Sequence, residues 1–180
     1  MLLVVDNGSV YTKNLIDFLT KKIEFESMSY NKINPSDLSK YDSFILSGRR
    51  KNDQKINAFN SQIVKHAILK TRPLLGICYG AEILTLTLGG TIKKSKFPRN
   101  GTQKISITEK NPLCNEKIDV FESHTYEISR LGDSLVSIGN SNSCKNEIIR
   151  YNNSNIFGTQ FHPEMTIDGK NLIKKFYNLK

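Results

Sequence analysis

The 180-residue chain has no tryptophan, only three cysteines and no long apolar run. An odd number of widely separated cysteines does not suggest a disulfide framework, and no Cys-x-x-Cys pair or histidine-rich cluster suggests a metal site. No stretch approaches the roughly 20 apolar residues that a membrane-spanning helix needs. The apolar start of the chain, residues 1–5, lacks the basic region and length of a secretory signal. These absences predict a cytoplasmic protein with no metal and no membrane partner.

Positive charge is in excess, with 26 basic and 17 acidic residues and a net charge of +9. Such a balance is typical of many nucleic-acid-binding proteins. Here, however, the lysines are scattered and no basic run is interleaved with aromatic residues. We therefore predict no nucleic-acid partner. The densest basic group is interpreted as a solvent-facing surface, or alternatively as a docking surface for an acidic partner: Lys93, Lys94, Lys96, Arg99 and Lys104.

Strand and helix patterns alternate through the first two-thirds of the chain. Continuous apolar runs and apolar residues at helical spacing predict, in order, strand 2–5, helix 10–22, strands 23–28 and 41–46, helix 52–70, strand 73–77 and helix 79–88. From residue 91 the pattern predicts short strands at 104–108, 119–121, 135–138, 147–151 and 156–161, and a closing helix at 169–179. We expect one α/β domain over residues 1–180. Its core should be a doubly wound, mostly parallel sheet flanked by helices, with a smaller antiparallel extension in the second half.

A cysteine between two glycines follows the strand at 73–77. Gly76 and Gly80 lie two residues on either side of Cys78, so the chain can turn sharply and present the thiol at the start of the next helix. The helix dipole at that point favours the thiolate, and the unpaired amides of the first turn can bind an oxyanion. Taken alone, the motif fits a buried structural cysteine equally well.

A second reactive pair follows the strand at 156–161. Residues two apart in extended backbone point the same way, so His162 and Glu164 should share a face, and the proline between them stiffens the backbone. A carboxylate beside an imidazole fixes its tautomer and stabilises the imidazolium. A surface His-Pro turn is the alternative for this segment alone. Because Cys78, Gly48 and His162 all follow strands, they should meet at one sheet edge, which favours a catalytic triad.

These residues give the chain a resemblance to the class I (triad) glutamine amidotransferases over nearly its full length. Cys78, His162 and Glu164 match that family's nucleophile, base and orienting acid in order and separation. The strand and glycine loop at residues 45–48 match the segment that precedes the nucleophile. Within the family, residues 4–9, Tyr11 and residues 122–124 resemble the glutaminase part of GMP synthase.

The resemblance implies glutamine hydrolysis through a glutamyl thioester, without a cofactor. It places the backbone oxyanion donors at Tyr79 and Arg49. It also implies a set of substrate-binding residues: Gly48, Glu82, Ser123, Thr125 and Tyr126. Because the chain has no Gly-rich nucleotide-binding loop, a separate synthase subunit is the expected consumer of the ammonia, first of all an ATP-using subunit of the GMP-synthase type. An amidotransferase subunit of anthranilate or aminodeoxychorismate synthase, a γ-glutamyl hydrolase and a catalytically weak regulatory module remain alternatives.

Two positions depart from the family pattern. Arg49 stands where a second glycine is usual, and a non-glycine residue adopts positive φ reluctantly, so we expect an oxyanion loop that a partner or the substrate must reshape. Glu82 stands where glutamine is common, four residues after the nucleophile. Its charge should oppose the α-carboxylate of glutamine, unless it binds the α-ammonium group or points into solvent.

Overall fold

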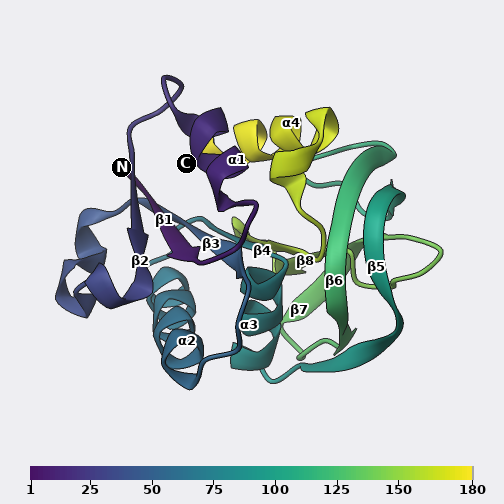
Figure 1. Ribbon diagram of the computed structural model, residues 1–180, viewed down its shortest axis with the longest axis horizontal. Helices are drawn as coiled ribbons and strands as arrows, with labels where there is room; N and C mark the ends of the chain where they lie inside the picture. Colours follow the sequence, from purple (N-terminus) through teal and green to yellow (C-terminus); the bar gives the residue numbers. More distant parts are fainter. Residues whose placement is uncertain (180) are drawn as a thin grey trace.

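The computed structural model describes residues 1–179, which fold around a nine-stranded sheet (Figure 1). The strands are β1 (Leu2–Asn7), β2 (Phe25–Ser29), β3 (Ser43–Arg49), β4 (Leu74–Ile77), β5 (Thr91–Ile107), β6 (Ile118–Arg130), β7 (Leu135–Asn140), β8 (Ile148–Tyr151) and β9 (Ile156–Thr159). Their order across the sheet is β2-β1-β3-β4-β9-β8-β7-β5-β6. The pairs from β2 to β9 are parallel, and those from β9 to β6 are antiparallel. The predicted fold class is confirmed.

Helices cover both faces of the parallel part of the sheet. They are α1 (Thr12–Leu19), α2 (Gln54–Leu69), α3 (Tyr79–Thr87) and α4 (Ile167–Tyr177). Helices α1 and α4 lie on one face, and α2 and α3 lie on the other (Figure 1). Alternate residues of β1 face these two layers, so Val4 belongs to the same core cluster as Leu15 and Phe176, whereas Val5 clusters with Ile63.

The helix boundaries follow local sequence signals. Asp53 caps α2, because its carboxylate accepts from the backbone N–H groups of Lys55 and Ile56 at 2.7 and 3.3 Å. The predicted start of this helix near residue 52 is therefore confirmed. Helix α3 is followed by Gly89 at φ +82°, a conformation that glycine adopts without strain.

The second half has much longer strands than its sequence predicts. β5 and β6 form a two-stranded ribbon of 17 and 13 residues, whereas the sequence predicts only 104–108 and 119–121 in this region. The prediction was wrong because the residues around 93–103 are mostly exposed and polar. They give no apolar alternation, and backbone pairing extends the ribbon instead. A bulge interrupts the ribbon, since Lys94 pairs with Tyr126 while Arg99 pairs with His124.

Candidate active site

Cys78 lies in a tight turn between β4 and α3. Its backbone has φ +50° and ψ −102°, an unfavourable combination for a residue with a side chain. The flanking glycines allow the turn. A Cβ at Gly76 would lie 2.4 Å from the carbonyl carbon of Gly80, and a Cβ at Gly80 would lie 2.4 Å from the carbonyl oxygen of Leu46. The N–H of Cys78 donates to Thr159 O at 2.7 Å, which ties the turn to β9. The structure therefore has the sharp elbow that the two glycines predict.

Residue Cys78 is only 9% exposed, and this burial controls the acidity of its thiol. Burial raises the pKa of Cys78 well above the ordinary thiol value, and the charges of Glu82 and Glu164 raise it further. The Tyr79 N–H and the Arg49 charge lower this pKa, but by less. The helix N-terminus favours the thiolate as expected, through the Tyr79 N–H, but burial outweighs this effect. Chemistry at Cys78 needs a base.

His162 and Glu164 form a buried pair directly after β9. His162 Nδ1 lies 2.8 Å from Glu164 Oε1, and both side chains are almost inaccessible. The carboxylate accepts, so the ring carries its proton on Nδ1 and leaves Nε2 as the basic nitrogen. The predicted pairing is present, but its geometric reason was incomplete. His162 is extended, whereas residues 163–165 form a 3₁₀ turn that brings Glu164 close to the ring.

Three contacts fix the position of the imidazole. The ring of Tyr11 lies 4.5 Å from that of His162, centroid to centroid, and His162 N donates to Phe121 O at 2.8 Å. A Cβ at Gly48 would lie 2.9 Å from His162 Cε1, so only glycine leaves room for the ring. Because β3, β4 and β9 are neighbours, their carboxyl ends bring Gly48, Cys78 and His162 to one edge of the sheet.

A cleft of about 290 Å³ opens beside Cys78. Its lining residues are Arg49, Arg50, Asn52, Cys78, Tyr79, Glu82, Ser123, His124, Thr125 and Tyr126. The structure thus gathers the residues expected to bind substrate around one cleft, apart from Gly48, which abuts His162 instead. A larger hollow of about 430 Å³ near Met1 and Tyr177 has neither cysteine nor histidine in its lining.

Arg49 is held by side-chain contacts without backbone strain. Within residues 1–179, positive φ at non-glycine residues occurs at Lys21, Thr71, Cys78 and Asn152, so the expected conflict at Arg49 is absent. Its Nη1 donates to Asn52 Oδ1 and Asn57 Oδ1, both at 2.7 Å. Its guanidinium carbon lies 4.1 Å from the Tyr79 ring centroid, and the Tyr79 hydroxyl donates to the same Asn57 oxygen at 2.9 Å.

These contacts join the two segments expected to supply the oxyanion donors. Arg49 ends β3 and Tyr79 begins α3, and Asn57 of α2 bridges both side chains. Asn57 was not predicted from the sequence, because a single asparagine on a helix carries no local signal of such a bridge.

Glu82 points into the protein, so the solvent-facing alternative is wrong. Its side chain lines the cleft and the residue is only 6% exposed. Burial raises the pKa of Glu82 to about 7, although the Arg49 charge and the Gln160 side-chain amide both lower it.

The wall of the cleft opposite α3 comes from β6. Ser123, His124 and Tyr126 of this wall pair with β5 as part of the long ribbon. Gln160 lies behind this wall, fully buried, and its Oε1 accepts from Ile128 N at 2.9 Å. Gln160 was not predicted either, because it lies inside an otherwise apolar strand end.

Neither a metal centre nor a membrane-spanning helix is found in the part of the chain that the structure describes. No group of three or more His, Cys, Asp or Glu side chains there is arranged to hold a metal ion. None of the helices within residues 1–179 is both long and apolar enough to cross a bilayer.

Known proteins resemble this chain over nearly all of its length. The family model described as Glutamine amidotransferase class-I matches residues 3–179. A GMP synthase [glutamine-hydrolyzing] subunit of Thermoplasma acidophilum is 30% identical over 182 residues, which cover 98% of this chain and 90% of that protein. GMP synthase [glutamine-hydrolyzing] of Vesicomyosocius okutanii is 29% identical, with 97% of this chain but only 35% of that protein covered.

A solved structure shares the same architecture. It is described as a GMP synthase subunit from Thermoplasma acidophilum, with a TM-score of 0.85 and 28% identity. The match covers 97% of this chain and 90% of that one.

Proposed function

The chain belongs to the class-I glutamine amidotransferase family, and on that basis we propose that it is the glutaminase subunit of a GMP-synthase-type enzyme. It hydrolyses glutamine to glutamate and delivers the ammonia to a separate, ATP-using synthase subunit. The observation that carries the proposal is the buried His162–Glu164 pair at the sheet edge where Cys78 opens into a cleft. The similarity to GMP synthase [glutamine-hydrolyzing] subunits of nearly the same length supports the choice of pathway.

In this proposal the reaction begins with a proton transfer. His162 takes the proton of the buried Cys78 thiol, and the sulfur attacks the side-chain amide carbon of glutamine. Backbone N–H groups of Tyr79 and Arg49 stabilise the oxyanion that forms. His162 then protonates the departing nitrogen, so that ammonia leaves and a glutamyl thioester remains on Cys78. Water, activated by His162, hydrolyses this thioester and restores the thiol.

Substrate recognition is assigned to the remaining residues of the cleft. Glu82 and Arg49 present opposite charges at its base, and Ser123, Thr125 and Tyr126 form the facing wall. Gly48 contributes by leaving room for His162. Since an amino acid carries both an ammonium and a carboxylate group, a cleft with both signs of charge suits the backbone end of glutamine.

The proposal is tested by ammonia release from glutamine, with the chain alone and in complex with a GMP-synthase-type subunit supplied with ATP and its nucleotide substrate. We expect slow release alone and a marked increase in the complex. Absence of release in both cases would overturn the proposed reaction. A high rate that the partner does not change would contradict the proposed dependence on a synthase, and preference for γ-glutamyl peptides would favour a hydrolase instead.

A further inference from the structure

Arg49 places a positively charged side chain in the cleft beside Cys78, and neutral groups fix its position. Its Nη1 donates to Oδ1 of Asn52 and of Asn57, both at 2.7 Å, and its guanidinium carbon lies 4.1 Å from the Tyr79 ring centroid. The hydrogen bonds found for this side chain within residues 1–179 use only Nη1. A guanidinium held at one nitrogen and on one face keeps Nε and Nη2 as a pair of donors that fits a carboxylate.

No acidic side chain neutralises this guanidinium by direct contact. None of the carboxyl groups within residues 1–179 lies within ion-pairing distance of Arg49. This includes Glu82, which lines the same cleft and on which the Arg49 charge acts through space. A half-buried guanidinium without a contacting counter-ion attracts an anion into its cleft.

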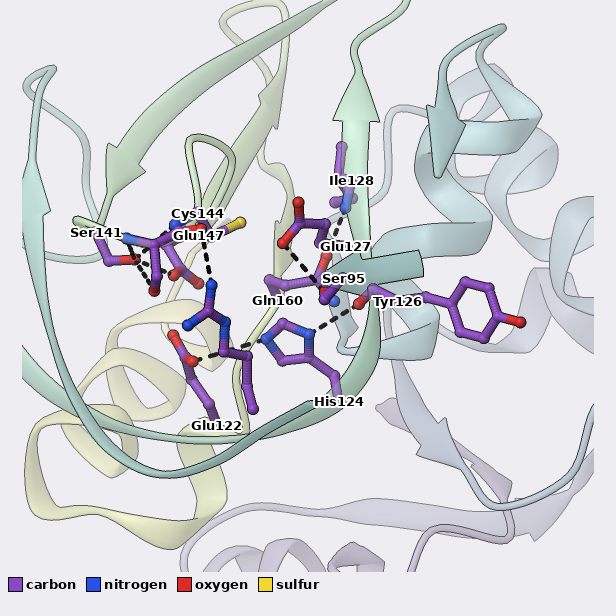
Figure 2. Close-up of polar contacts among 12 residues, drawn as sticks. Ser95, Glu122, His124, Tyr126, Glu127, Ile128, Ser141, Cys144, Glu147 and Gln160 are labelled. Carbon is purple, nitrogen blue, oxygen red and sulfur yellow. Dashed lines mark hydrogen bonds and ion pairs between the residues drawn. The ribbon is translucent and has the colours of Figure 1, made fainter. Parts of the chain in front are cut away.

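The other basic residues of the cleft lack one requirement for this role. In the β6 wall, His124 Nδ1 lies 2.8 Å from Tyr126 O, and burial lowers the pKa of this ring despite the charge of Glu122 (Figure 2). The His124 ring is therefore neutral at neutral pH. Arg50 is exposed, and its side chain makes no hydrogen bond or ion pair with residues 1–179. Among the cleft-lining residues that the structure describes, Arg49 is thus the one that is both charged and held in place.

Asn57 ties the Arg49 side chain to the ring on which it stacks. The Oδ1 atom of Asn57 accepts from Arg49 Nη1 and also from the Tyr79 hydroxyl, the latter at 2.9 Å. Its Nδ2 donates to Asn52 Oδ1 at 3.3 Å, which is the second oxygen that holds Arg49. Asn57 lies on α2 and does not itself line the cleft, so any effect it has on a ligand there passes through its neighbours.

We propose that the Arg49 side chain binds the α-carboxylate of glutamine and that Asn57 is the positioning residue that holds it for this contact. This inference rests on the proposed function and assigns one end of its substrate. The carboxylate is expected to accept from Nε and Nη2, while the ammonium group and the side-chain amide of glutamine bind elsewhere in the cleft. 4-Aminobutanamide, which is glutamine without its carboxylate, should therefore gain no affinity from Arg49 or Asn57.

Calorimetry of both ligands tests this assignment. All proteins carry Cys78→Ala so that no ligand is consumed, and each is measured alone and with a GMP-synthase-type subunit. Asn57→Leu and Arg49→Ala should each raise the Kd for L-glutamine about tenfold or more and leave that for 4-aminobutanamide unchanged. Adding Asn57→Leu to Arg49→Ala should cause no further loss, because Asn57 acts through Arg49.

Asn57→Asp separates this role from a purely structural one. Aspartate keeps an acceptor for both the Arg49 guanidinium and the Tyr79 hydroxyl, so a merely structural bridge would survive and glutamine binding would not change. The new carboxylate, however, pairs with Arg49 and competes with the carboxylate of the substrate. We therefore expect Asn57→Asp to raise the Kd for L-glutamine about tenfold as well, without lowering the melting temperature.

Ser61→Ala is a matched control on the same helix. Ser61 lies one turn after Asn57, and its Oγ is 2.9 Å from Thr87 Oγ1, so the variant removes another bridge between α2 and α3 outside the cleft lining. It should leave the Kd of both ligands unchanged.

The proposal is overturned if glutamine binding is unchanged in Arg49→Ala or in Asn57→Asp, or if the two ligands lose affinity equally. These two variants decide the question if Asn57→Leu does not fold. Glutamine binding that depends on Arg49, in a chain with intact Cys78 that releases no ammonia, would refute the proposed function and support this inference. Normal ammonia release together with binding that does not depend on Arg49 would do the reverse.

Discussion

Replacing Glu82 by glutamine tests how the cleft controls the acidity of Cys78. The Glu82 carboxylate raises the pKa of the thiol, and its own pKa is raised to about 7. Its charge is therefore present above about pH 7 and absent well below it. Glu82→Gln keeps the shape of the side chain and removes that charge, so the thiolate of Cys78 should become more populated, but only where wild-type Glu82 is ionised.

The size of the effect follows from the position of Glu82 one helical turn after Cys78. Four residues of helix rise by about 6 Å, and two unit charges about 6 Å apart at an effective dielectric of about 20 interact by about 3 kcal/mol. The opposite charge of Arg49 acts on both groups and cancels part of this energy. Taking about half of it, about 1.4 kcal/mol, gives about tenfold more thiolate in Glu82→Gln.

Alkylation by iodoacetamide, resolved by mass spectrometry of the Cys78 peptide, measures this population. The rate ratio of Glu82→Gln to wild type should be about ten at about pH 8.5 and about one at about pH 5.5. Exposed Glu109 offers a matched control, since Glu109→Gln removes one charge outside the cleft and should leave both rates unchanged. A ratio that is the same at both pH values, or slower labelling in Glu82→Gln, would refute the electrostatic reasoning.

Three further predictions concern the residues around the thiol. Because Cys78 and His162 should act as one unit, adding His162→Ala to Cys78→Ala should lower ammonia release little beyond the loss in either single variant. Glu164→Ala alone should cause a smaller loss than either of them. Additive losses in the double variant would contradict this prediction. Gly48→Ala places a Cβ 2.9 Å from the His162 ring. It should lower kcat at least about tenfold while the melting temperature changes little. An unchanged kcat would show that the position of the ring is not critical. Arg49→Ala removes a positive charge that favours the thiolate, so alkylation of Cys78 should become slower, opposite to Glu82→Gln; faster alkylation would exclude that role.

Local sequence signals predicted the parallel half of the fold and the elbow. Continuous apolar runs and glycine positions suffice there, because a buried parallel strand and a tight turn each impose requirements on neighbouring residues. The same holds for the contact between His162 and Glu164, which are two residues apart.

Other features depend on residues far apart in the chain. The β5–β6 ribbon is stabilised by backbone pairing between exposed residues, which leaves no apolar pattern. The pKa of Cys78 likewise depends on both kinds of feature, since the helix terminus that lowers it is local whereas the burial that raises it comes from the whole fold.

The central claim is that Cys78 hydrolyses glutamine, and the most direct test compares cysteine variants of the chain in complex with a GMP-synthase-type subunit. Ammonia release from glutamine should be lost in Cys78→Ala and retained in Cys114→Ala, whose buried cysteine lies outside the cleft. Synthesis driven by added ammonia should continue in both variants, which shows that the complex is intact. Glutamine-dependent ammonia release that persists in Cys78→Ala would contradict the account.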